Sequence, residues 1–287
     1  MKRLGLLCAA GALTGGVFLS AQQIAIPEPR RGSGDSVTGA FEGWFYNPDG
    51  SRTFLVGYYN RNSRQELDVP IGPNNRIEPG GPDLGQPTHF LPGRQWGMFT
   101  VAAPRDFKPT DKFVWSITSN GQTTQIPLRM NADYVMSPFT EIAANNTPPA
   151  IRFEQNGKGV QGPLATLATA PSRTATVGAP LAVTIWVNDD MRYTSGTGTG
   201  PAANRPPVAV RWSKYRGPGA VTFEKANPEV EKISQSEGAF AGKATVNATF
   251  KEAGDYALHV IVNDYSGDGG AGFGCCWSTG LVKVSVK

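Results

Sequence analysis

Two short acidic segments contain the residue types from which a cation site can be built. One reads Asn-Asp-Asp, and the other combines Asn-Asp with a second aspartate four residues later. The candidate binding residues in these segments are Asn188, Asp189, Asp190, Asn263, Asp264 and Asp268. Because Ca²⁺ takes about six to eight oxygen ligands, Asp189, Asp190, Asp264 and Asp268 are predicted calcium ligands. Their spacing matches neither an EF-hand nor a nonapeptide repeat, and the alternative is that they cap turns at strand ends.

Cys275 and Cys276 are adjacent, which is the rarest feature of the sequence. In an oxidising compartment they can form a vicinal disulfide that stiffens a loop, and this is the pairing we expect. The alternatives are two inert thiols, a soft-metal site for an ion such as copper, or a bond to a partner chain. The C-x-x-C spacing of an oxidoreductase is missing. Phe273 and Trp277 flank the pair, so we expect the loop tip to pack against an apolar surface or a partner.

The two histidines, His89 and His259, belong to no catalytic pattern. His89 lies in a proline-rich stretch, residues 72–95, without strand period; long loops of this kind are often functional, which makes His89 a binding candidate. The alternative is an ordered loop that caps the end of a sandwich. Strand alternation places His259 on an outer sheet face, against a neighbouring domain or solvent. Neither G-x-S-x-G nor H-E-x-x-H occurs, and we predict that the protein is not an enzyme.

Alternating apolar residues between Val208 and Val262 predict the strands that would hold both acidic segments. Trp212 stands in mid-strand, as a core tryptophan would. Tyr256 follows a Gly-Asp turn, where an immunoglobulin-type sandwich places its tyrosine corner. In that topology, the loops at 188–205 and 263–280 emerge at the same end of the sandwich. The acidic segments and the cysteine pair are therefore predicted to converge there.

The composition predicts an all-β protein with many turns. Charged residues make up 17% of the 287 residues, and the chain contains 35 glycines and 23 prolines. Aromatic runs at 43–46 and 53–59, joined by Asn-Pro-Asp-Gly, indicate a hairpin in the first half. Further strands fit residues 66–71, 96–102, 113–118 and 123–128, which is the size of a fibronectin or immunoglobulin sandwich. We therefore predict two β-sandwich domains, one in each half of the chain.

The predicted boundaries follow changes in local composition. Residues 1–21 have a basic start, an apolar run and a small-residue cleavage site, as in a signal peptide; an uncleaved anchor is the alternative. Residues 22–36 are a polar tether, and residues 37–144 form the first sandwich. An Asn-Asn-Thr-Pro-Pro run marks a linker at 145–150, and residues 151–287 form the second sandwich.

A series of residues in the second half resembles PKD-like and related immunoglobulin-like modules of bacterial surface and secreted proteins. The matching positions are Trp212, Gly217, Pro218, Val221, Phe223, Thr249, Phe250, Gly254, Tyr256 and Asp264. The resemblance covers about 80 residues and implies a β-sandwich, a fold that hosts many unrelated functions. Leu258 stands where an antibody-type domain has its second cysteine, so the inter-sheet disulfide of that fold is absent. The first domain resembles no characterised family.

These observations predict an exported, non-enzymatic binding or structural protein of the bacterial envelope, as an accessory subunit of a larger assembly. Its expected location is secreted, periplasmic or at the cell surface, with a protein or envelope component as partner. Membrane contact is expected only if the N-terminal segment is retained, and the scattered basic residues at net charge +4 argue against nucleic acid. One alternative is a metal protein that binds calcium or copper. Another is a carbohydrate-binding module that uses Trp44, Phe45, Tyr46, Tyr58, Tyr59 and Trp96.

Overall fold

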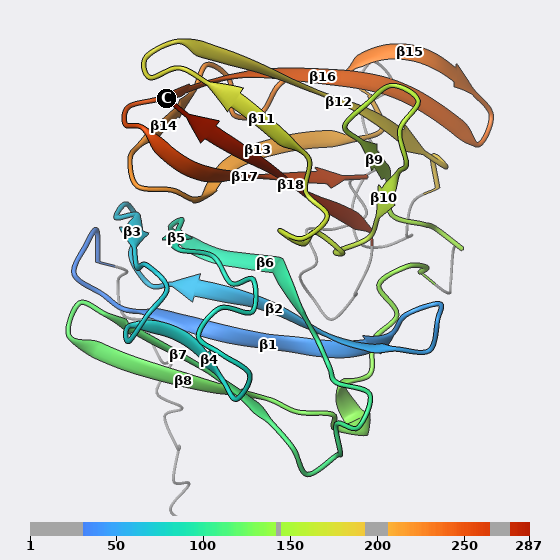
Figure 1. The fold of residues 1–287 in the computed structure, drawn as a ribbon. Coiled ribbons are helices and arrows are strands. Elements are labelled where there is room, and N and C mark those ends of the chain that lie inside the picture. Colours follow the sequence, from blue (N-terminus) through green and yellow to red (C-terminus); the bar gives the residue numbers. More distant parts are fainter. Residues whose placement is uncertain (1–30, 142–144, 193–205, 265–275) are drawn as a thin grey trace, which may run out of the picture.

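The computed structural model describes residues 31–141, 145–192, 206–264 and 276–287, and these residues are almost entirely β-structure. The only helical element in these ranges is a short 3₁₀ turn, η1 (Ala132–Tyr134). Within them, no helix has the length and apolar character needed to cross a bilayer. The predicted all-β class with two sandwiches is confirmed, and four main sheets are layered one on another (Figure 1).

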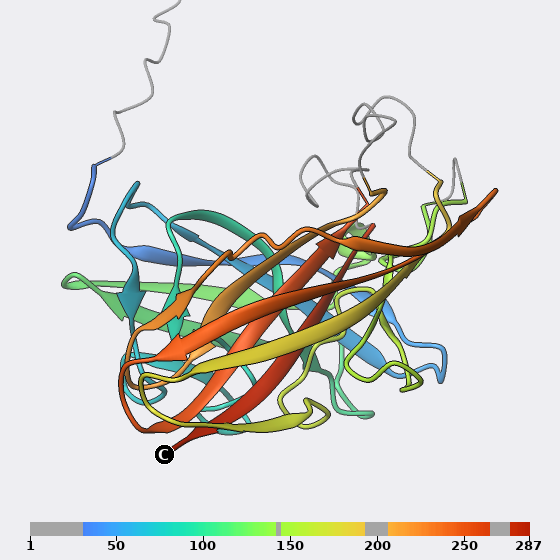
Figure 2. The ribbon, with the colours of Figure 1, turned by 90° about the horizontal axis from the view of Figure 1, so that it is seen from above.

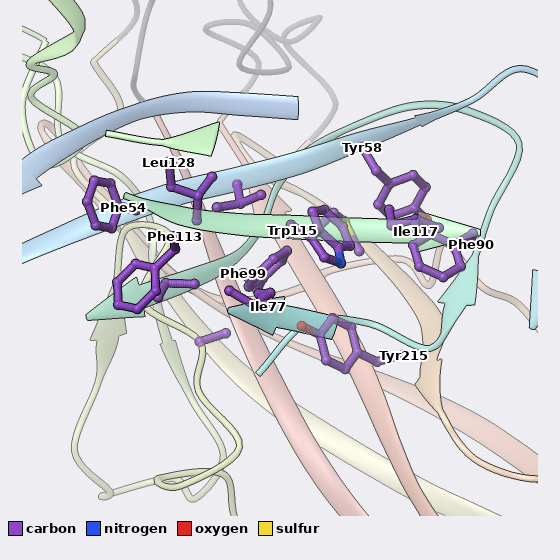
Figure 3. Packing of buried hydrophobic residues seen from close by; sticks show 14 of the residues in the cluster. Phe54, Tyr58, Ile77, Phe90, Phe99, Phe113, Trp115, Ile117, Leu128 and Tyr215 are labelled. Atoms are coloured by element: carbon purple, nitrogen blue, oxygen red, sulfur yellow. The ribbon is translucent and has the colours of Figure 1, made fainter. Parts of the chain in front are cut away.

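The first sandwich packs two three-stranded antiparallel sheets against each other. Large apolar side chains fill the space between them, with Phe54, Phe99 and Trp115 near its centre (Figure 3). One sheet has the order β1-β2-β6, with strands β1 (Val37–Tyr46), β2 (Arg52–Asn60) and β6 (Gly93–Ala102). The other has the order β4-β7-β8, with strands β4 (Asn75–Glu78), β7 (Phe113–Ser119) and β8 (Gln122–Leu128).

The second sandwich has the strand arrangement of an immunoglobulin-type fold. One sheet has the order β11-β18-β17-β13, with strands β11 (Ser172–Ala175), β18 (Trp277–Val286), β17 (Gly254–Asn263) and β13 (Ala209–Arg216). The other has the order β10-β9-β12-β16-β14, with strands β10 (Val160–Gln161), β9 (Ala150–Arg152), β12 (Pro180–Asp189), β16 (Ala239–Phe250) and β14 (Val221–Phe223). Strand β15 (Glu231–Ser236) also pairs with β16.

Two residues singled out from the sequence take their expected places in this sandwich. Trp212 is 2% exposed and lies in the core between the two sheets. The Tyr256 hydroxyl donates to the Glu252 carbonyl oxygen at 2.8 Å and accepts from the Gly219 amide at 3.1 Å. This back-bond to the turn before the strand is the tyrosine corner. The structure therefore confirms an immunoglobulin-like sandwich, although nothing in it separates PKD-like modules from their relatives.

The two sandwiches meet sheet on sheet. The sheet β1-β2-β6 of the first sandwich lies against the sheet β11-β18-β17-β13 of the second (Figure 1). From above, the long strands of the second sandwich cross obliquely over those of the first (Figure 2). Tyr215, Ala257 and Leu281 of the second sandwich are buried within the apolar cluster that also holds Phe90 and Trp115 of the first (Figure 3). The apolar core of the first sandwich thus extends to the outer sheet face of the second, whose own core is a separate cluster.

The proline-rich stretch at 72–95 supplies much of the polar contact between the sandwiches. The Arg216 guanidinium donates to both carboxylate oxygens of Asp83 at 2.8 Å and, through Nε, to the Gln86 carbonyl oxygen at 2.9 Å. The Tyr215 hydroxyl donates to the Gly85 carbonyl oxygen at 2.5 Å. The sequence predicted that this stretch has no strands, but it contains two. These are β4 and β5 (His89–Phe90), and β5 pairs with β3 (Leu67–Asp68). The role of the stretch is to hold the two domains together.

His259 shows how completely this contact covers the outer sheet face. His259 lies on the outer face of its sheet, as strand alternation predicted. With the neighbouring domain packed on that face, only 1% of the residue is exposed. Its ring stacks on Tyr215, with 5.7 Å between the ring centroids. Burial, assisted by the positive charge of Arg211, lowers the pKa of His259 to about 3. The imidazole is therefore neutral at physiological pH and serves as a packing group.

Candidate functional site

The candidate site lies at one end of the second sandwich, which we call the loop pole. Strands β12 and β17 end there, at Asp189 and Asn263, and strands β13 and β18 begin there, at Ala209 and Trp277. Asn263 pairs with both Ala209 and Trp277, so three strand ends are neighbours in one sheet. The predicted site residues Asp268, Phe273 and Cys275 lie outside the described residues.

Asp189 and Asp264 are two buried carboxylates at the loop pole. Asp189 is 7% exposed and Asp264 has no exposed surface. Oδ1 of Asp189 accepts from the Met191 amide at 2.8 Å, whereas its buried Oδ2 has no hydrogen-bond partner among the residues that the structure describes. Asp264 accepts from the Asn146 side-chain amide at 2.7 Å. Sequence reasoning missed Asn146, because it read the segment at 145–150 only as a linker.

The pKa of Asp189 reflects this environment. Burial raises it to about 8; the Met191 amide opposes the shift, and the negative charges of Asp264 and Asp190 add to it. Asp189 is therefore neutral at pH 7, chiefly because burial disfavours its charged form, and the nearby charge of Asp264 adds to this. The pair therefore needs either a proton or a bound cation.

Asp190 and Asn188 act as structural residues at the same end. The Asp190 carboxylate accepts from the Thr147 amide at 3.0 Å and the Thr147 hydroxyl at 2.8 Å. It also accepts from the Arg192 amide at 2.9 Å, so it caps the turn after β12. The Asn188 side-chain oxygen accepts from Arg152 at 2.7 Å. In the ranges that the structure describes, no three Asp, Glu, His or Cys side chains form a metal-ligand group, so the four-aspartate calcium set stays a prediction.

Cys276 and Trp277 both turn inward at the start of β18. Cys276 is fully buried and disulfide-bonded, so it offers no free thiolate for copper. The vicinal pairing itself stays a prediction, since Cys275 is outside the described residues. Trp277 is 3% exposed and packs on the first sandwich, beside Phe45 and Leu55. The predicted packing of this flank against an apolar surface is therefore observed.

Gly97 makes room for Trp277 in the first sandwich. Its φ of +53° lies in the left-handed region, which favours glycine. A Cβ atom at this position would lie 2.7 Å from the Trp277 ring. The bulge in strand β6 at this point is thus fitted to the aromatic side chain of the other domain.

His89 is not part of the loop pole. It lies near the far end of β13, where Nδ1 is 3.0 Å from Asp68 and Nε2 is 3.2 Å from Glu66. The Lys214 ammonium reaches the same Asp68 oxygen at 2.9 Å across the domain interface. Both ring nitrogens of His89 therefore face carboxylates of its own sandwich, and Asp68 is the residue that also forms an ion pair across the interface.

The aromatic side chains of the first domain, which the carbohydrate-binding alternative would place on an exposed face, are mostly buried in the core and the domain contact. Trp44, Phe45 and Tyr58 are 6%, 1% and 0% exposed, because both faces of their sheet are covered. Trp44 donates its indole N–H to the Asn131 carbonyl oxygen at 2.7 Å. Tyr46, at the strand end, is 58% exposed and contacts the edge of the Trp44 ring, with 5.1 Å between the ring centroids. A flat platform for stacking sugar rings is therefore not formed by these side chains.

An interdomain groove opens beside the buried carboxylates and has a volume of about 450 Å³. Strands β6 and β13, each the outermost strand of its sheet, form its two sides. Its lining residues are Arg94, Trp96, Ala209, Val210, Arg211, Asn227, Ile261, Asn263 and Trp277. Two of the predicted site residues, Asn263 and Trp277, belong to this groove, whereas Arg94, Arg211 and Asn227 were missed. No local motif marks those three, because domain packing alone brings them together.

No protein-family model matches the chain, and no curated protein matches it. Solved structures with similar folds include a titin fragment, A168–A169, at 12% identity and a TM-score of 0.22, covering 87% of this chain and 98% of that one. Domains 4 and 5 of the S-layer protein SbsC give 11% identity and a TM-score of 0.23, with 88% and 98% covered. A PapD-like domain of human CEP192 gives 14% identity and a TM-score of 0.22, with 56% and 96% covered. Similarities this weak give no information on function, which is therefore argued from the residues of this chain.

Proposed function

We propose that the protein is an exported, non-enzymatic structural and binding module of the cell envelope, acting as an accessory subunit of a periplasmic or surface assembly. The observation that supports this is the sheet-on-sheet union of the two sandwiches. The buried Tyr215 and the bidentate Arg216–Asp83 pair join them into one unit of stacked sheets instead of two hinged domains (Figure 1). Such a unit presents the loop pole to a partner in a fixed orientation.

The residues of the described chain favour binding over catalysis. Its two histidines are held by packing and by carboxylates, and neither faces a nucleophile. The groove at the loop pole is lined by arginine, tryptophan and asparagine, which are residues that recognise ligands. The export signal predicted at residues 1–21 places the module outside the cytoplasm.

Site-specific photocrosslinking tests the envelope role. A benzophenone amino acid at Arg192, next to the loop pole, is expected to crosslink one defined envelope partner in cells that express the full chain. The matched control is the same group at Lys251, an exposed residue in the turn between β16 and β17. That turn is about 30 Å from the pole along β17. Equal crosslinking from both positions, or recovery of the chain only as a free soluble monomer, would contradict the proposal.

Calcium binding at the loop pole is the second candidate function. The specific observation in its favour is the buried Oδ2 of Asp189, which lies near the buried Asp264 and has no hydrogen-bond partner within the described ranges of the chain. A divalent cation would neutralise both carboxylates and supply the missing contact.

Calorimetric titration with CaCl₂ at pH 8 checks this candidate. The full chain is expected to bind Ca²⁺, and Asp189→Asn is expected to lose at least tenfold in affinity because it removes a ligand charge. Asp106→Asn, which changes an exposed carboxylate elsewhere, is the control and is expected to bind like the wild type. Absence of calcium uptake by the wild-type chain would contradict calcium binding. It would indicate that a proton, and not a cation, neutralises the carboxylate pair.

A further inference from the structure

The described lining of the interdomain groove contains two arginines and no acidic residue. Arg94 and Arg211 come from different sandwiches and meet at Gln95: Nη1 of Arg94 donates to its backbone oxygen at 2.8 Å, and Nη2 of Arg211 donates to its side-chain oxygen at 3.3 Å. None of the nine lining residues is Asp or Glu. The groove is therefore a site where two guanidinium groups are held close together by the domain contact.

The two arginines differ in how far their charge is already used. Nη2 of Arg94 lies 2.9 Å from the buried Glu42, and its guanidinium stacks 3.8 Å from the centre of the Trp96 ring. Arg211 is exposed and takes part in no ion pair with the residues that the structure describes. Its charge contributes to the lowered pKa of the buried His259, after burial itself. Arg94 is thus a fixed support, and Arg211 is the cation available to a ligand.

The remaining lining residues are of the kinds that hold a sugar ring. Trp96 is partly exposed within the groove, whereas Trp277 is almost buried and forms part of its apolar wall. Aromatic and aliphatic surfaces pack against the C–H face of a sugar. Asn227 is exposed at the rim, and its side-chain amide offers both a donor and an acceptor to hydroxyl groups. The volume of about 450 Å³ falls within the usual range for small-ligand pockets.

We propose that the interdomain groove binds an acidic oligosaccharide, with its anionic group on Arg211 and a sugar ring against Trp96. A planar guanidinium can donate two parallel hydrogen bonds to a carboxylate or a sulfate, which fixes both position and orientation. This site differs from the exposed aromatic face that was one alternative from the sequence. Here the ligand would be recognised by the charge of Arg211 and by the shape of the interdomain groove. Of the six aromatic residues named for that face, Trp96 is the one that lines the groove. The groove site gives the proposed envelope module a ligand class, and it does not depend on any protein partner.

Titration calorimetry of the full chain with three trisaccharides tests the groove. The probes are trigalacturonate, which carries carboxylates, a sulfated galactose trisaccharide, and neutral maltotriose. We expect at least one acidic probe to bind and maltotriose not to. Arg211→Gln is expected to weaken that binding about tenfold or more, since a hydrogen bond to a charged group contributes about 1.5–3 kcal/mol. Arg105→Gln removes the same charge from an exposed site and is expected to bind like the wild type.

The outcomes separate the ligand sources and the competing explanations. Binding of trigalacturonate alone identifies the anionic group as a carboxylate, and binding of the sulfated probe alone identifies it as a sulfate; both support the proposal. Equal losses in Arg211→Gln and Arg105→Gln would overturn it, since they indicate attraction to net charge only. Inorganic sulfate binding as tightly as either acidic sugar, or no binding of either, would also overturn it. None of these results depends on the crosslinking experiment, so the two proposals fail separately.

Discussion

Replacing Tyr215 by alanine is expected to lower the free energy of unfolding by about 3–5 kcal/mol, the range for removing a large buried aromatic side chain. Tyr215 has no exposed surface and packs within the core of the first sandwich although it belongs to the second. Its loss creates a cavity in the interface and removes the stacking partner of His259. Because the cavity lies between the domains, we expect the variant to unfold in two steps in urea, followed by near-ultraviolet circular dichroism.

Two further variants locate the source of this effect. Tyr215→Phe keeps the ring but loses the hydrogen bond to Gly85, and is expected to cost about 1 kcal/mol or slightly more. Tyr46→Ala removes an exposed ring from the same protein and is expected to cost about 1 kcal/mol or less. A loss in Tyr215→Ala no larger than that in Tyr46→Ala would show that the interface contributes little to stability.

Asp189→Asn is expected to stabilise the chain at alkaline pH and to flatten its pH dependence. The folded carboxyl keeps its proton up to about pH 8, whereas the ordinary value is 3.8. The folded state therefore binds more protons than the unfolded state between these values, and its stability falls as pH rises through this window. The contribution of this group is fully present below 3.8 and fully lost above 8. Asparagine stays neutral throughout and can still accept from the Met191 amide.

Thermal denaturation between pH 4 and pH 9, in buffer with a chelator, measures this effect. At pH 9 we expect Asp189→Asn to exceed the wild type by several kcal/mol, since one pKa unit corresponds to about 1.4 kcal/mol. At pH 4 the two chains are expected to differ little. Asp106→Asn again serves as the control, with a wild-type pH profile. A wild-type chain whose stability rises steadily from pH 5 to pH 9 would contradict the placement of Asp189.

Much of the second sandwich could be predicted because its signals are local. Strand alternation placed Trp212 in the core and His259 on the outer face, and a Gly-Asp turn located the tyrosine corner at Tyr256. These features depend only on the period of a strand and on turn chemistry. The same reasoning brought Asp189 and Asp264 to one end of the fold, where the structure places them.

The contact between the sandwiches could not be predicted, because it has no local pattern. Nothing around Asp83 or Gln86 in the proline-rich stretch indicates a partner 130 residues away or more. The aromatic residues of β1 and β2 were ambiguous for the same reason. Alternation assigns Phe45 and Tyr58 to faces but cannot say that a second domain covers one of them. The groove arginines, Arg94 and Arg211, likewise become neighbours only when the domains pack.

Differential scanning calorimetry of the full wild-type chain tests most directly whether the two sandwiches form one unit. The apolar cluster that contains residues of both sandwiches and the Arg216–Asp83 pair predict a single transition. The calorimetric enthalpy of that transition is expected to equal its van't Hoff enthalpy, as in a two-state unfolding of the whole chain. Two separate transitions, each with the enthalpy expected for about half of the chain, would contradict this account.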